Sequence, residues 1–80
     1  MTAEQYRAAL VALALPVQGG RTCRLLGVTK RMSAYYAAGT YPVPPRVANM
    51  VWIMRRAAHA GLSPDRLIAY LDWKEANPPG

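Results

Sequence analysis

Apolar residues recur every three or four positions in three parts of the chain. Near its start, Tyr6, Leu10 and Leu13 fall on one helical face. This spacing predicts amphipathic helices, because side chains three and four residues apart share one side of a helix. The two later stripes comprise Val47, Met50, Val51, Met54 and Ala58, and then Leu67, Ile68 and Leu71.

Capping and helix-breaking residues bound the first of these stripes. Thr2, followed three residues later by Gln5, has the form of a capping box. The first helix is therefore expected over 3–15, with Pro16 ending it. The stretch 40–45, Thr-Tyr-Pro-Val-Pro-Pro, cannot be helical, because proline lacks a backbone donor and restricts the residue before it.

The second half of the chain is expected to hold two more helices. One begins at Pro45, a residue type that suits a first helical turn, and ends before Gly61. The other follows Ser63, whose side chain can cap it, and has Pro64 in its first turn. Residues 77–80 have nothing to pack and are expected to form a flexible tail. The chain is thus interpreted as one domain over residues 1–76.

Two shorter helical patterns, over 20–26 and 30–38, flank a Gly-Val-Thr break. Gly27 can take the positive φ that ends a helix, and Thr29 can cap the helix that follows. Gly39 then ends this second helix. A helix, a tight turn and a second helix within about twenty residues form a helix-turn-helix.

Further residues match a known pattern: Leu26-Gly27-Val28-Thr29, then Tyr36 and Gly39, and then Pro44, Val47 and Ala48. With them, the region 21–54 resembles the Cro/repressor-like (XRE-type) helix-turn-helix family. The resemblance implies a lambda-repressor-like, all-α fold, a compact bundle of about five short helices with the motif at helices 2 and 3. The Leu-Leu-Gly sequence and Arg31 with Tyr35-Tyr36 are also similar to small phage-type repressors, including those associated with anti-CRISPR operons.

The chain departs from this family at helix-packing positions. Cys23 stands where the family carries Ala, and it is small enough for the helix crossing. Tyr36, in contrast, matches the family at the position that anchors the second helix of the motif. The family buries Val or Ile where this chain has Ser33. Either Met32 is expected to take over that packing, or the helix is expected to be slightly rotated.

The resemblance implies that residues 30–38 lie in the major groove of DNA. Lys30 and Arg31 are the principal expected base readers, since an Arg fork can bond both O6 and N7 of guanine. The alternative, in which both touch only phosphate or solvent, stays open. The full set of expected base contacts is Thr29, Lys30, Arg31, Ala34 and Tyr35, and that of expected backbone contacts is Arg21, Arg24, Thr40, Tyr41 and Arg46.

The charge distribution favours a polyanionic partner. The chain has a net charge of +6, from ten Lys and Arg against four acids. The acids are Glu4, Asp65, Asp72 and Glu75, so the stretch 5–64 contains no carboxylate. Such an uncompensated field attracts nucleic acid and makes binding dependent on salt. A merely solubilising basic surface is the other reading of this charge.

Several other functions are disfavoured. The apolar run 8–15 is far too short to span a bilayer, and Glu4 argues against a signal peptide. The single Cys23 fits a reducing compartment, so a cytoplasmic protein is expected, bacterial and nucleoid-associated or phage-encoded. Cys23 and His59 alone make neither a metal site nor a catalytic pair. No enzyme activity, cofactor or small-molecule ligand is expected.

The function that the sequence favours is sequence-specific binding of double-stranded DNA by a transcriptional regulator. A repressor that binds a palindromic operator as a homodimer is the expected form, with Trp52, Leu71 and Trp73 as candidate dimer contacts. The alternatives are an architectural or recombination accessory factor of excisionase or packaging type, and a basic helical protein-interaction module. A solvated face is the expected role of Arg55, Arg56 and His59.

Overall fold

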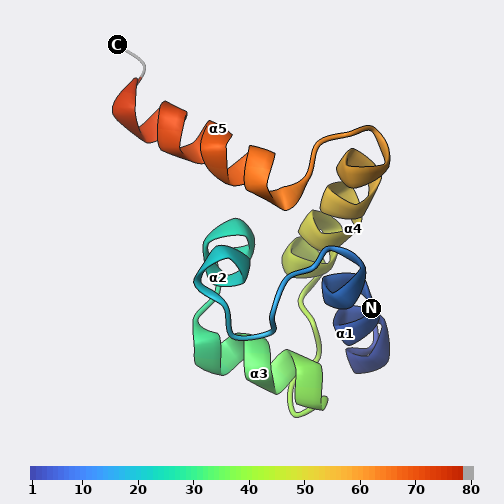
Figure 1. The fold of residues 1–80 in the computed structure, drawn as a ribbon. Coiled ribbons are helices and arrows are strands. Elements are labelled where there is room, and N and C mark those ends of the chain that lie inside the picture. Colours follow the sequence, from blue (N-terminus) through green and yellow to red (C-terminus); the bar gives the residue numbers. More distant parts are fainter. Residues whose placement is uncertain (79–80) are drawn as a thin grey trace.

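The computed structural model describes residues 1–78. Over that part of the chain its regular secondary structure consists of helices alone, joined by turns and loops. Its elements occur in the order that the sequence predicts, and the all-α fold class is confirmed (Figure 1). The five helices are α1 (Ala3–Ala12), α2 (Gly20–Leu26), α3 (Lys30–Ala38), α4 (Pro45–His59) and α5 (Pro64–Ala76).

Side-chain caps start three of these helices. At α1 the box is complete: the Thr2 hydroxyl accepts the backbone N–H of Gln5 at 3.0 Å, and the Gln5 side chain accepts that of Thr2 at 2.8 Å. At α3 and α5 only one of these two bonds forms: the hydroxyls of Thr29 and Ser63 each accept the backbone N–H of the residue three positions later. These bonds satisfy N–H groups that have no partner inside a helix, which is why the helices begin there.

The predicted end of the first helix is wrong, since α1 stops at Ala12 and not at Leu15. Ala14 has a φ of 55°, in the left-handed region, and the Leu15 N–H donates back to the Leu10 carbonyl at 2.9 Å. This is a Schellman closure, and it is made with Ala in a position that favours Gly. The reversal lets Leu13 and Leu15 both enter the core. In a continuing helix their side chains would point about 200° apart.

The core lies where α1, α3 and α4 meet. Tyr6 and Leu10 of α1 and Val51 and Met54 of α4 are all at most 1% exposed. The rings of Tyr6 and Tyr36 approach to 5.9 Å between centroids, which joins α1 to α3. Burial of this apolar surface is the main force that holds the short helices together.

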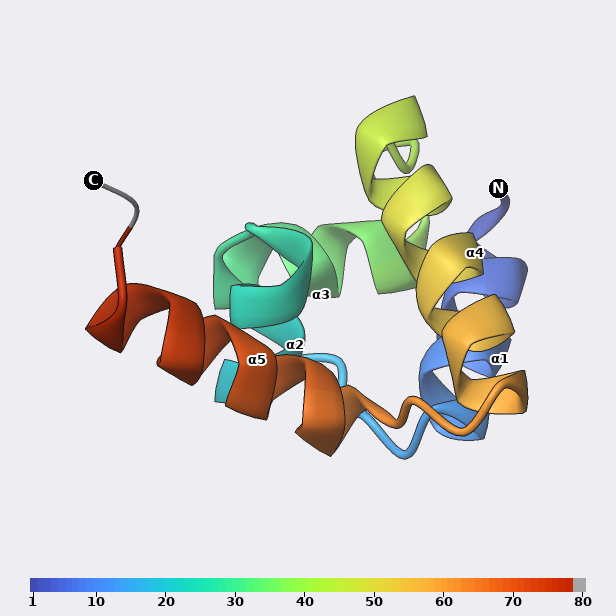
Figure 2. The same cartoon turned by 90° about the horizontal axis from the view of Figure 1, so that it is seen from above.

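Helix α5 stands apart from this core. Figure 1 shows α2 between α3 on one side and α5 on the other, and Figure 2 shows α5 extending away from α4. Pro64 is its one buried residue, while Leu67, Ile68 and Leu71 are half-buried along the side that faces the domain. The predicted tail starts at Asn77, which follows α5 directly, and residues 79–80 lie outside the described part.

Within residues 1–78, no helix combines the length and the apolar character that crossing a lipid bilayer requires.

Candidate nucleic-acid interface

The turn between α2 and α3 is built as the sequence predicts. Gly27 has a φ of 66° and its N–H donates to the Cys23 carbonyl at 2.8 Å, which closes α2. A Cβ at Gly27 would meet no other atom, so the backbone conformation is the reason for a glycine there. Thr29 then accepts the Met32 N–H at 3.1 Å and starts α3. Three residues therefore separate the two helices and fix where α3 begins.

Ser33, Tyr36 and Ala37 seat α3 on the domain. Ser33 is fully buried and Met32 is only partly buried beside it, so Met32 does not replace Ser33 in the core. Its hydroxyl donates to the Val17 carbonyl at 2.5 Å and lies 2.6 Å from the Tyr6 hydroxyl. A hydroxyl with both partners in place can occupy a core position that an apolar side chain usually takes, because its polar atom stays hydrogen-bonded.

Sequence reasoning also missed Thr22, which is fully buried one position before Cys23. Its hydroxyl donates to the Pro16 carbonyl at 2.5 Å, tying α2 to the loop that precedes it. Cys23, expected at the helix crossing, is only half-buried. Nothing in the sequence indicated that Thr22, and not the neighbouring Cys23, faces the core.

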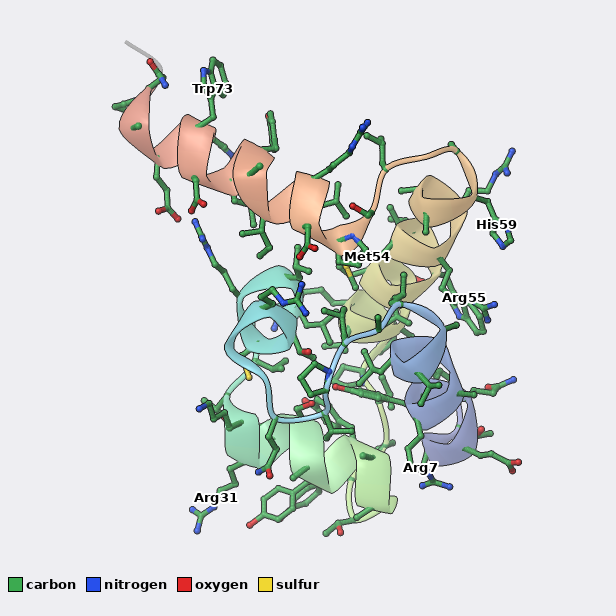
Figure 3. All side chains as sticks on the ribbon, in the orientation of Figure 1. Arg7, Arg31, Met54, Arg55, His59 and Trp73 are labelled. Carbon is green, nitrogen blue, oxygen red and sulfur yellow. The ribbon has the colours of Figure 1, made fainter. Side chains whose placement is uncertain are left out.

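The opposite side of α3 carries the predicted base contacts on one exposed surface. Lys30 and Arg31 are exposed in its first turn, and Arg31 points away from the molecule (Figure 3). Among the described residues, neither side chain has a hydrogen-bond or ion-pair partner. Ala34 and Tyr35 are half-buried beside them, and Thr29 is exposed at the start of the helix. We call these five residues the α3 face.

The segment after α3 borders this face. Tyr41 is 51% exposed and its ring meets that of Tyr35 edge-on, with centroids 5.2 Å apart. The Thr40 N–H donates to the Tyr35 carbonyl at 3.0 Å, so that N–H is already used. The Thr40 and Tyr41 hydroxyls remain as the groups through which this segment could bond a phosphate.

Two of the predicted phosphate contacts are engaged elsewhere. Arg21 pairs with Asp65, while Arg24 reaches Asp72 at 2.5 Å and Glu75 at 3.0 Å. These bonds, first with Asp72 and then with Glu75, raise the pKa of Arg24 above its ordinary value. The carboxylates all belong to α5. A phosphate at either guanidinium would have to displace a carboxylate, so we leave Arg21 and Arg24 out of the candidate interface.

Two other arginines lie at helix ends: Arg46 at the start of α4, and Arg7 against the last turn of α3. Arg46 is exposed in the first turn of α4, and within residues 1–78 its side chain has no bonded partner. Arg7 of α1 donates to the Ala37 carbonyl in the last turn of α3 (Figure 3). A cation there is favourable, because the carbonyl end of a helix is partly negative. The sequence offered no signal for Arg7, since thirty residues separate the two partners.

The charges are therefore sorted between two regions. The three acids of α5 neutralise arginines of α2, whereas residues 30–59 contain five Lys and Arg and no acid. Five of the net six positive charges thus belong to α3 and α4. This region is where a polyanion would be attracted, because the field of α2 is largely cancelled locally.

The predicted dimer contacts do not form one surface. Trp52 is 43% exposed on α4, but it lies two residues from Met50, so the two side chains point about 200° apart. Met50 lines a hollow together with the half-buried Leu71 of α5. Trp73 is 61% exposed at the far end of α5, where its ring stacks on Tyr70 at 6.1 Å. Leu71 and Trp73 are likewise two residues apart on α5, so the three candidates point in different directions.

The arrangement provides a rigidly seated helix with a cationic and aromatic exposed side, which suits hydrogen bonding and ion pairing to an extended anionic ligand. Comparison of the chain with protein-family models, with curated proteins and with solved structures found no match in any of the three.

Proposed function

We propose that this protein binds double-stranded DNA in a sequence-specific manner and acts as a transcriptional repressor. The observation that carries the proposal is the α3 face. Lys30 and Arg31 project from a helix whose other side is held in the core by Ser33 and Tyr36. A helix that is fixed on one side and cationic on the other suits insertion into the major groove.

The proposed contacts divide into those made to base edges and those made to phosphates. Arg31 and Lys30 bond the edges of bases, and Tyr35 contacts a thymine methyl group or a phosphate. Arg46 and the hydroxyls of Thr40 and Tyr41 hold the phosphates beside the groove. This differs from the interface that the sequence predicts, because Arg21 and Arg24 are paired with acids and are not included.

A domain of this size gains affinity and specificity by binding as a symmetric dimer. Two copies of α3 would then occupy half-sites about 34 Å apart, one helical turn of DNA. The exposed Trp73 with its stacked partner Tyr70 is the aromatic pair available for such a contact on α5. Repression would follow from blocking the polymerase, acting in the cytoplasm on the gene itself or on a neighbour.

The test is fluorescence anisotropy with labelled duplex from immediately upstream of the gene, at near-physiological salt, with and without excess random duplex. Specific binding that survives the competitor is the expected result. Binding abolished by the competitor would mean that the chain, with its net charge of +6, binds this duplex only through non-specific attraction to the phosphates. The repressor proposal for that site would then be rejected. A reporter gene under the same upstream DNA then tests repression directly.

A further inference from the structure

A groove runs along α2, with α4 as one wall and α5 bordering only its smaller end. It consists of a hollow of about 420 Å³ between α2 and α4 and a hollow of about 220 Å³ between α2, α4 and α5. Leu25 of α2 and Met50 of α4 line both, so the two hollows adjoin. Ile53 on one wall is 61% exposed and Tyr70 on the other is 55% exposed. An exposed apolar surface of this kind in a small domain marks a place where another molecule binds.

The fold leaves this groove open because α4 and α5 diverge. Figures 1 and 2 both show α5 leaving the end of α4 and running away from it along α2. The apolar residues Leu67 and Leu71 of α5 are consequently covered on their α2 side and only half-buried overall. No residue of α3 lines either hollow, so an occupant of the groove would leave the α3 face free.

The charges at the groove are basic. Arg46 lines the larger hollow at its α4 side, while Arg24 lines its α2 side but is already paired with two carboxylates of α5. Arg46 has no bonded partner in the described part of the chain. Helical spacing adds Lys74, which is four residues from Tyr70 and so shares its side of α5. An occupant with carboxylates beside an apolar stripe would match both features.

The molecule itself contains one example of this recognition. Helix α5 lies on α2 by placing the apolar Leu71 towards Leu25 and by bonding Arg24 with Asp72 and Glu75. An acidic, amphipathic helix is therefore a shape and a chemistry that this side of α2 already accepts. The second wall of the groove, with Ile53 and Arg46, presents the same combination of apolar and basic groups without a helix on it.

A second copy of this chain does not fit that description. The chain has four acids, and Asp65, Asp72 and Glu75 of these are paired with arginines of their own α2. The fourth, Glu4, lies in the first turn of α1, a helix that lines neither hollow. A symmetric dimer through this surface would also bring each basic rim towards its own copy, since such an interface is self-complementary.

We infer that the groove along α2, bordered by α4 and at its smaller end by α5, is a docking site for an acidic, amphipathic helix of another protein. The apolar side of that helix would lie on Leu25, Met50 and Ile53, and its carboxylates would pair with Arg46 and Lys74 at the rim. The site lies off the α3 face, so a partner bound there would leave the proposed base readers free, although it would share Arg46 with the proposed phosphate contacts. This inference goes beyond the proposed function and does not depend on it.

The probe is a fluorescein-labelled peptide of about 15 residues, with Leu at positions i, i+3, i+4 and i+7 and Glu beside them, and its counterpart with Lys in place of Glu. Anisotropy is measured on the full chain without DNA, so a failure of DNA binding does not affect the result. We expect the Glu peptide to bind saturably and the Lys peptide not to bind. Ile53→Asp should weaken binding by about tenfold or more, and Arg46→Gln by about threefold.

Arg55→Gln is the matched control, with the same charge change on the same helix. Arg55 lines a separate hollow with Ala12 and His59 on the α1 side of α4 (Figure 3), so this variant should bind the peptide as the parent chain does. Circular dichroism checks the folding of each variant, and exposed Ile53 tolerates substitution.

Four results would overturn the inference. The Glu peptide fails to bind; the Lys peptide binds equally well, so that the carboxylates are not recognised; or Arg55→Gln weakens binding as much as Arg46→Gln, so that binding is only general attraction to a chain of net charge +6. Alternatively, sedimentation shows a dimer of the free chain that Ile53→Asp dissociates, in which case a second copy occupies the groove.

Discussion

The hydroxyl of Tyr6 lies 2.6 Å from the hydroxyl oxygen of Ser33, and both side chains are fully buried. Ser33 donates its single hydrogen to the Val17 carbonyl, so Tyr6 must be the donor to Ser33. This chain of two bonds joins α1, α3 and the loop before α2. The seating of the proposed recognition helix thus rests on a buried polar network as well as on apolar contacts.

Ser33→Ala is expected to lower the free energy of unfolding by about 1–3 kcal/mol, because it leaves both the Tyr6 hydroxyl and the Val17 carbonyl without a partner. Tyr6→Phe should cost less, about 1 kcal/mol, since Ser33 keeps its bond to Val17. The double variant should be less destabilised than the sum of the two, because it removes the orphaned phenol. Urea unfolding of all four proteins measures this coupling, and strict additivity would contradict the network.

Stability at alkaline pH should depend on Tyr6. Burial raises the pKa of Tyr6 above its ordinary value of 10.0, since the phenolate is poorly solvated in the core. The folded pKa therefore exceeds the unfolded one. The stability that the neutral phenol contributes is complete below about pH 10 and is lost as the pH rises through the folded pKa. Urea unfolding at about pH 8 and about pH 11 should show a smaller alkaline loss for Tyr6→Phe than for the parent chain. Equal losses would show that burial does not hold the phenol neutral.

Ala14→Gly should stabilise the protein. Ala14 has a φ of 55°, a conformation that costs an L residue about 1–2 kcal/mol and costs glycine little. Part of this gain is offset by the greater entropy of glycine in the unfolded chain, so a net gain of about 0.5 kcal/mol and a rise in Tm of about 2–4 °C are expected. Ala8→Gly, in the interior of α1 and also exposed, is the control and should lower Tm instead. A fall in Tm for both variants would refute the strain at Ala14.

Two arginines should respond differently when DNA binding is measured. Arg31→Gln removes an unpaired cation from the α3 face, so we expect a loss of about 1–3 kcal/mol in binding the specific duplex. Arg24→Gln removes a cation that is already paired with Asp72 and Glu75, so the affinity and its salt slope should change little. Anisotropy titrations at several salt concentrations compare the two. A larger effect for Arg24 would mean that α5 gives up its ion pairs on DNA and that the interface extends over α2.

The helix boundaries were predictable because their causes are local. Thr2, Thr29 and Ser63 cap the helices that follow them through bonds three residues long, and prolines stand in the first turns of α4 and α5. The one wrong boundary also has a local geometry, but its cause is not local. Ala14 takes a left-handed conformation because Leu13 and Leu15 both reach a core that helices from later in the chain complete.

The candidate site was predictable only in part, for the same reason. That Lys30, Arg31 and Tyr35 share the outward side of α3 follows from helical spacing once the helix is placed. That Arg24 pairs with Asp72 and Glu75 does not follow from helical spacing, because these partners lie 48 and 51 residues further along the chain. Binding of DNA by the α3 face stays a prediction until it is measured.

By itself, then, the sequence determined five helices, their caps and the three-residue turn after α2, since these depend on neighbours within one helical turn. Only the tertiary structure decided which polar residues are buried and which arginines are neutralised. Ser33 is tolerated inside because groups of distant segments complete its hydrogen bonds, and Arg21 and Arg24 are paired because α5 folds back onto α2. Spatial proximity between segments far apart in the chain settles both, whereas Thr22 is held by the Pro16 carbonyl only six residues before it.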